Sequence, residues 1–135
     1  MPRNKITSPR NPQIQKVTRL REPQERQRTG LTVVDGWREV LRAQDAGFVF
    51  QQLFFCPGLF KKYGDDTLIR RMESAGRFAI FEVSAEIFSK IAFGDRSEGI
   101  LAVIQSKVLK LKDLKLGKPP LCCLVEGLEK PGNLG

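Results

Sequence analysis

The first thirty residues are rich in side chains that can bind phosphate. They hold eight lysines and arginines against two glutamates, a net charge of +6, whereas residues 31–105 carry −1 and residues 106–135 carry +3. An arginine guanidinium offers a planar fork of N–H donors that matches a phosphate group. The charge pattern therefore favours contact with a polyanion. The cations that we assign to phosphate contact are Lys5, Arg10, Lys16, Arg19, Arg21, Arg26 and Arg28.

The basic segment is also compatible with two simpler roles. A run of like charge often serves only to keep a surface solvated. A basic segment can also lie on an anionic membrane, but that requires an apolar helical face, which we do not expect in residues 1–30. We expect these residues to form an arm outside the core, so that residues 1–28 can be deleted without loss of the fold.

The chain offers little for catalysis or metal binding. It contains no histidine, which excludes His-based triads, His general bases and most zinc sites. Its three cysteines show no CxxC spacing and are interpreted as small buried residues. Helix caps and solvated helix faces account for the carboxylates, and neither common glycine-rich phosphate-loop spacing occurs. We therefore predict no metal site and no complete catalytic site.

The compartment follows from the same features. The first thirty residues are almost wholly polar, and no apolar run approaches about 18 residues, so the sequence predicts neither a secretory signal nor a membrane span. An odd number of cysteines argues against a disulfide framework. These features indicate a cytoplasmic protein.

Helical and strand patterns alternate through the middle of the chain. β-branched and aromatic runs predict strands, and apolar residues at i, i+3 and i+4 between them predict helices. This alternation predicts an α/β fold, a small three-layer α/β/α domain with a mainly parallel or mixed sheet. The predicted elements are strands over 31–36, 48–55, 77–83 and 99–104, and helices over 37–46, from Asp65 or Asp66 to Gly76, and after the capping residue Ser84.

The last fifteen residues look unlike an ordinary C-terminus. "LCCLVEGLEKPGNLG" begins with an apolar run, residues 121–125, and continues into a Gly-containing loop. A terminal strand must still bury its side chains and pair its backbone groups, and no following element can supply either need. We expect residues 121–125 to be the first strand of an interrupted further domain.

Three segments resemble the SpoU (TrmH-type) family of RNA 2′-O-ribose methyltransferases. The first is "ITSPRNPQIQKVTRLREPQERQRTGLTVVDGWREV", residues 6–40, with Ile6-Thr7-Ser8, Asn11-Pro12 and Asp35-Gly36 in the family's pattern. The second is "SEGILAVI", residues 97–104, which is similar to the closing strand of the family's substrate-binding domain. The third is "LVEGLEKPGNLG", residues 124–135, which resembles the first motif of the methyltransferase domain.

The resemblance implies a division of labour within a longer protein. It implies an N-terminal RNA-binding domain of ribosomal-protein-like type and a catalytic SPOUT domain that binds S-adenosylmethionine and pairs into a homodimer. Asn133 and Gly135 match the start of the first catalytic motif, while the Arg of that motif and the knotted cofactor loops have no counterpart in the sequence. This chain alone is therefore expected to bind no cofactor and to transfer no methyl group. Asn11 is either a polar RNA contact or part of a local turn with Pro12.

The sequence as a whole is interpreted as a substrate-recognition domain for structured RNA, rRNA or tRNA, joined to the start of a catalytic domain. One alternative is a stand-alone RNA-binding module of ribosomal-protein-like type with no catalytic role. A protein-interaction domain is a further alternative, but it leaves the basic segment unexplained. The expected parts are a basic arm over 1–30, an α/β RNA-binding domain over 31–105, a Lys-rich linker over 106–120 and the catalytic stub over 121–135.

Overall fold

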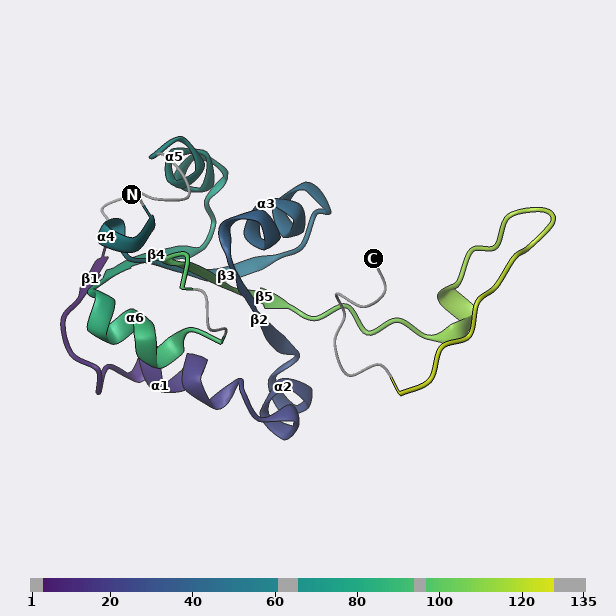
Figure 1. Cartoon of the computed structure of the whole chain (residues 1–135), viewed down its shortest axis with the longest axis horizontal. Coiled ribbons are helices and arrows are strands. Elements are labelled where there is room, and N and C mark those ends of the chain that lie inside the picture. The colour runs from purple at the N-terminus through teal and green to yellow at the C-terminus, as the bar shows by residue number, and fades with distance from the viewer. Residues whose placement is uncertain (1–3, 61–65, 94–96, 128–135) are drawn as a thin grey trace.

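A five-stranded mixed sheet forms the centre of the molecule (Figure 1). The computed structural model describes residues 4–60, 66–93 and 97–127. The strand order is β1-β4-β3-β5-β2. β4 pairs in parallel with β1 and β3, whereas β5 runs antiparallel to both β3 and β2. The strands are β1 (Asn4–Ile6), β2 (Leu31–Asp35), β3 (Phe50–Phe55), β4 (Ala79–Val83) and β5 (Ile100–Gln105).

Helices cover both faces of this sheet. Figure 1 shows α3 and α5 on one face and α1 and α6 on the other, and the two buried clusters follow the same division. The three-layer α/β/α expectation is confirmed, with the sheet mixed rather than mainly parallel. The helices are α1 (Pro12–Arg19), α2 (Pro23–Thr29), α3 (Trp37–Asp45), α4 (Pro57–Phe60), α5 (Asp66–Ala75) and α6 (Ala85–Ile91), followed by the short 3₁₀ helix η1 (Leu111–Asp113).

The two central strands explain why this sheet is stable. In β3, Phe54 packs into the cluster under α1 and α6, while its neighbours Leu53 and Phe55 pack into the cluster under α3 and α5. In β5, every residue from Ile100 to Ile104 is buried. A strand covered on both faces needs a continuous apolar run, and the sequence supplies one at each place. None of the helices described is long and apolar enough to cross a membrane.

The helix borders follow the expected capping residues. The hydroxyl of Ser84 accepts a hydrogen bond from the Ile87 N–H at 3.3 Å and so begins α6 as predicted. Gly47, at φ +68°, follows the end of α3 in the left-handed conformation that glycine adopts most easily. The described residues between 31 and 105 thus form the strands and helices that the sequence pattern predicts, and the short helix α4 is an addition that the pattern did not predict. Asp65, one of the two expected caps of α5, lies outside the described residues.

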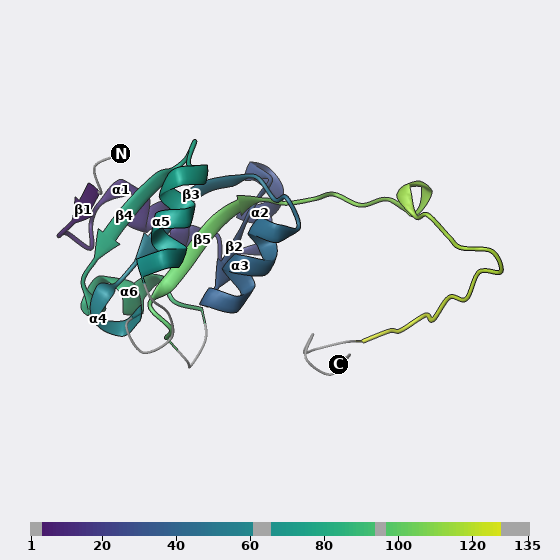
Figure 2. The same ribbon diagram turned by 90° about the horizontal axis from the view of Figure 1, so that it is seen from above.

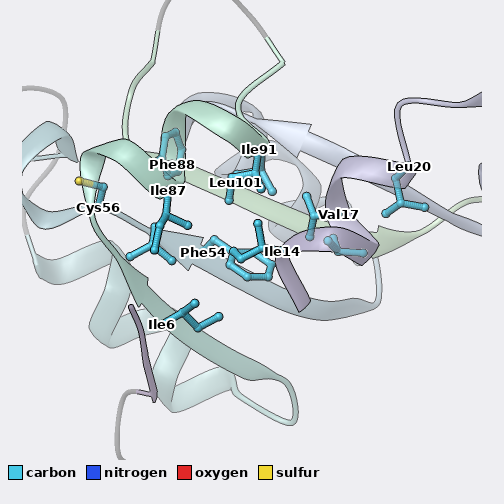
Figure 3. Packing of buried hydrophobic residues seen from close by; sticks show 12 residues of the cluster. Ile6, Ile14, Val17, Leu20, Phe54, Cys56, Ile87, Phe88, Ile91 and Leu101 are labelled. Carbon is cyan, nitrogen blue, oxygen red and sulfur yellow. The ribbon is translucent and has the colours of Figure 1, made fainter. Parts of the chain in front are cut away.

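The N-terminal segment departs from its expectation. β1 pairs with β4, and α1 lies on α6, with Ile14, Val17 and Leu20 pointing into the core (Figure 3). The exposed fraction of each of these three side chains is 3% or less. The expectations of an arm without an apolar helical face and of a harmless deletion of residues 1–28 are therefore wrong, because that deletion would remove one strand, one covering helix and part of a core cluster.

The segment after β5 leaves the domain. Figures 1 and 2 show residues 107–127 running away from the sheet as an extended excursion. Leu121 and Leu124 are each 97% exposed, and residues 121–127 form no strand here. Among the residues that the structure describes, no apolar surface covers the run 121–125. The expectation that the three cysteines are buried is correct for Cys56 and wrong for Cys122 and Cys123, because these two lie in the exposed run.

Candidate functional site

The predicted basic residues lie on α1, on α2 and in the turns around them, except for Lys5, which lies on β1. Their contacts in the structure differ. Asn11 belongs to the first turn of α1, where its Oδ1 accepts a hydrogen bond from the Gln13 N–H at 2.9 Å. This bond caps the helix, and Pro12 occupies the first helical position, where an N–H is not needed. Of the two roles considered for Asn11, the structure shows the local one.

Arg21 and Arg26 hold the fold together around the end of α1. The Nη1 of Arg26 donates to the carbonyls of Leu20 and Arg21, at 2.8 and 2.7 Å, just beyond the last turn of the helix. The Nη2 of Arg21 donates to the carbonyls of Lys90 and Ala92, both at 2.9 Å, at the end of α6. Both guanidiniums therefore have structural partners, which sequence alone did not reveal.

Arg28 forms a bidentate pair with Glu25 one turn earlier on α2. The two hydrogen bonds, from Nε and Nη2 of Arg28 to the two carboxylate oxygens, measure 2.9 and 2.6 Å. The hydrogen bonding from Arg28 lowers the pKa of Glu25 below its ordinary value of 4.5, and nearby Arg19 adds a smaller electrostatic contribution. The same pair raises the pKa of Arg28. Both groups therefore stay charged at neutral pH.

The remaining cations are exposed. Lys5 approaches Glu82 on the neighbouring strand at 3.8 Å. Within the described part of the chain, the side chains of Arg10, Lys16 and Arg19 carry no hydrogen bond or ion pair to the protein. An exposed guanidinium or ammonium without an internal partner keeps its donors available for a ligand.

Three of the cations meet at one groove between α1, α2 and the sheet. The groove has a volume of about 390 Å³, within the range of small-ligand sites. Its apolar base comes from α1 and from strands β2 and β5, and its rim is polar. The polar lining residues are Lys16, Arg19, Glu25, Arg28, Thr29, Gln51 and Gln52, and the apolar residues are Val17, Leu20, Leu31 and Val103. The other four predicted cations, Lys5, Arg10, Arg21 and Arg26, do not line it.

Gln51 and Gln52 are groove residues that sequence reasoning missed. Gln52 donates from Nε2 to the Gln13 Oε1 at 2.6 Å, which ties β3 to α1 beside the groove. The available signal was "FVFQQLFF", in which two adjacent amides interrupt an otherwise apolar strand. Two polar residues in such a run indicate a polar surface at one end of the strand.

The other predicted features give no second site. No cluster of metal-binding side chains occurs among residues 4–60, 66–93 and 97–127. Asp35 accepts a hydrogen bond from the Phe93 N–H at 2.7 Å, a structural contact between β2 and the end of α6. Asn133 and Gly135 lie outside the described residues.

Comparisons with known proteins point in one direction. Residues 11–102, about two thirds of the chain, match the family model for the MRM3-like substrate binding domain. A crystal structure of an RNA 2′-O ribose methyltransferase is 30% identical with a TM-score of 0.73, and the match covers 96% of this chain and 48% of that one. No curated protein sequence gives a significant match.

Two further solved structures share the fold at lower identity. The AdoMet-bound rRNA methyltransferase from Sinorhizobium meliloti is 20% identical with a TM-score of 0.66, and the match covers 82% of this chain and 40% of that one. The SpoU methyltransferase AviRb from Streptomyces viridochromogenes, also in complex with AdoMet, is 17% identical with a TM-score of 0.64, at 80% and 40% coverage. This chain thus spans less than half the length of each of these proteins.

Proposed function

Because the chain belongs to the MRM3-like substrate-binding domain family, we propose that it holds the RNA substrate of a ribose 2′-O-methyltransferase. The family expectation drawn from the sequence motifs is confirmed by the same match. The substrate that we propose is a structured RNA, either rRNA or tRNA. On this proposal the chain is part of a longer protein. We place methyl transfer, S-adenosylmethionine binding and homodimer formation in a separate catalytic domain of that protein.

The observation that carries this proposal is the pair Lys16 and Arg19 on the rim of the groove. They lie three residues apart on α1, so their side chains leave the same face of the helix. Both are exposed, and neither is held by a hydrogen bond or ion pair in the described part of the chain. With the Arg28–Glu25 pair contributing no net charge, the rim carries two uncompensated positive charges.

Such a rim suits the holding of an RNA backbone. Contacts to phosphate fix the orientation and register of a nucleic acid without reading its bases. Methylation of a 2′-hydroxyl requires the reacting atoms to be held within about 3 to 3.5 Å of each other. A small rigid domain that fixes the RNA backbone supplies part of that positioning, while the chemistry takes place on the other domain.

The rest of the chain fits a tether between two domains. We propose residues 106–120 as a linker and residues 121–135 as the start of the catalytic domain. The match to the RNA 2′-O ribose methyltransferase covers 96% of this chain, so it extends beyond β5 into these residues. On this proposal, the isolated chain binds RNA but transfers no methyl group.

The salt dependence of RNA binding tests the groove. In the double variant Lys16→Gln, Arg19→Gln, two phosphate contacts are lost, so the slope of log K against log salt should become shallower by about 1.4 to 1.8. Binding of a stem–loop RNA is measured by fluorescence anisotropy at several salt concentrations. Arg70→Gln is the matched control, since Arg70 is exposed on α5, on the other face of the sheet (Figure 1). An unchanged slope in the double variant would place the phosphate site elsewhere.

A further inference from the structure

A second hollow adjoins the groove at the beginning of the parallel strands. It has a volume of about 550 Å³ and lies where β1, β3 and β4 begin. Asn4, Gln51 and Arg77 contribute polar groups to it, and Phe78 to Ile80 contribute apolar surface. Gln51 lines both this hollow and the groove, so the two are neighbours that share one side chain.

Gln51 owes its position to an irregularity of the sheet. Between β3 and β5, Phe50 is opposite Ile104 and Gln52 is opposite Val103, so Gln51 has no Cα partner on β5. A bulge of this kind redirects a side chain out of the regular alternation of a strand, and bulges are frequent beside functional sites. The side chain of Gln51 is exposed, as expected for a residue displaced from the pleat.

The chemistry of the hollow differs from that of the groove. Its wall carries one guanidinium, Arg77, and one carboxylate, Glu73, so it offers no excess of positive charge. Asn4 and Gln51 each provide an amide that both donates and accepts hydrogen bonds. Phe78, half-buried against Phe50 with ring centroids 5.4 Å apart, adds aromatic surface. Mixed donors and acceptors beside apolar surface match the edge and face of a nucleobase better than they match a second phosphate.

We propose that this hollow binds one unpaired base of the RNA whose phosphates lie along the Lys16–Arg19 rim, with Gln51 contacting the base at the junction. This inference rests on the proposed function, because it needs an RNA strand in the groove. Proteins recognise RNA sequence chiefly in unpaired nucleotides, whose base edges and faces are accessible. The domain would thereby select single-stranded loops as well as hold a backbone.

The test compares loop and duplex binding in variants that change no charge. Gln51→Ala should weaken binding of a stem–loop RNA about tenfold, the cost of losing one good base contact. It should leave binding of a fully paired RNA duplex and the salt slope unchanged, because an amide releases no counterions. Stem–loops with oligo-A, oligo-C, oligo-G and oligo-U loops identify the preferred base. Gln24→Ala is the control, since Gln24 is exposed on α2 and lines neither hollow.

Two further variants, Asn4→Ala and the double variant Lys16→Gln, Arg19→Gln, distinguish failure of the base site from failure of the phosphate groove. Asn4→Ala should reproduce the loss seen with Gln51→Ala, since Asn4 is exposed and lines the same hollow. Equal weakening of loop and duplex binding, or unchanged loop binding in both variants, would overturn the base site. In that case a shallower salt slope in the Lys16→Gln, Arg19→Gln variant would leave the phosphate groove standing. Unchanged binding in all three variants would overturn both.

Discussion

At the scale of single residues, the cations of the N-terminal segment are equivalent in the sequence and unequal in the structure. Composition predicted their charge correctly, because charge is a property of the residue type. It could not predict that Arg21 and Arg26 donate to backbone carbonyls, because those carbonyls become available only when α1 ends and α6 packs beside it. Lys16 and Arg19 remain available for a ligand because α1 turns its apolar side inward and these two outward.

The Arg28–Glu25 pair gives a residue-scale prediction about acid titration. The folded-state pKa of Glu25 is lowered from 4.5, mainly by hydrogen bonding from Arg28. A carboxylate whose pKa is lower in the folded state stabilises the fold at pH values above its pKa in the unfolded chain. That stabilisation is lost as the pH falls through the lowered, folded-state pKa. Because Arg28 is exposed and Glu25 is half-buried, solvent screens the pair, so its effect on stability is small and the titration itself is the better measurement.

NMR detection of the Glu25 side-chain carboxyl carbon should show a midpoint below 4.5 in the wild-type chain. In Arg28→Gln the charged donor fork is removed, so the midpoint should rise toward 4.5. A Glu25 midpoint that did not move on this substitution would show that the pair does not persist in solution.

At the scale of elements, the sequence predicted the middle of the domain well and the first thirty residues poorly. Strands 50–55 and 100–105 and helices 37–45 and 85–91 have strong periodicity and clear caps, so local pattern and tertiary environment agree. The buried residues Ile14 and Val17 of α1 and its C-terminal cap Leu20 lie three residues apart among polar residues, and the charge of this segment obscured a narrow apolar face.

Helix α2 was missed for a different reason. It contains no buried residue, so hydrophobic periodicity could not reveal it. The only signals for this helix were its start and stop residues, Pro23 in the first turn and Gly30, at φ +66°, at the C-terminal end. The groove depends on the positions of both α1 and α2, so it could not be predicted once these helices were missed. For this reason the sequence analysis identified the cations of the groove but neither their arrangement nor the two glutamines beside them.

The buried face of α1 gives the prediction at this scale. Ile14 is 2% exposed and packs with the cluster under α1 and α6, so Ile14→Ala should lower the free energy of unfolding by about 2 to 5 kcal/mol. Lys16→Ala, an exposed change on the same helix, should alter it by no more than about 0.5 kcal/mol. Urea denaturation followed by circular dichroism measures both. Equal stability of the two variants would mean that α1 lies outside the cooperative core, as an arm would.

At the scale of the whole molecule, charge and core are separately organised. The two core clusters are closed by residues from 6 to 104, whereas lysines continue along the exposed segment beyond β5. That segment carries large apolar side chains as well, among them Leu111, Leu121 and Leu124, each more than 90% exposed. Burial and strand pairing require a neighbouring element whatever the local pattern, so the prediction that residues 121–125 are the first strand of a further domain stays a prediction.

The exposed segment supplies the last prediction, which concerns a chain shortened to end at Lys107. Packing a leucine or valine side chain stabilises by about 1.5 to 3 kcal/mol, but ordering one residue of backbone costs about 1 to 2 kcal/mol. Leu121 and Leu124 are each 97% exposed, so they gain no packing free energy that could offset the cost of ordering the backbone. Keeping Ser106 and Lys107 preserves the Ser106 N–H bond to the Gly30 carbonyl and the Lys107 contacts with Ala46 and Phe48. The shortened chain should therefore have the same free energy of unfolding as the full chain within about 0.5 kcal/mol.

Amide hydrogen exchange in the full chain should be fast over residues 121–125 and slow over Ile100–Ile104, which are buried. A loss of more than about 1 kcal/mol on shortening, or slow exchange of residues 121–125 in a monomer, would show that the segment has a binding place on this domain after all.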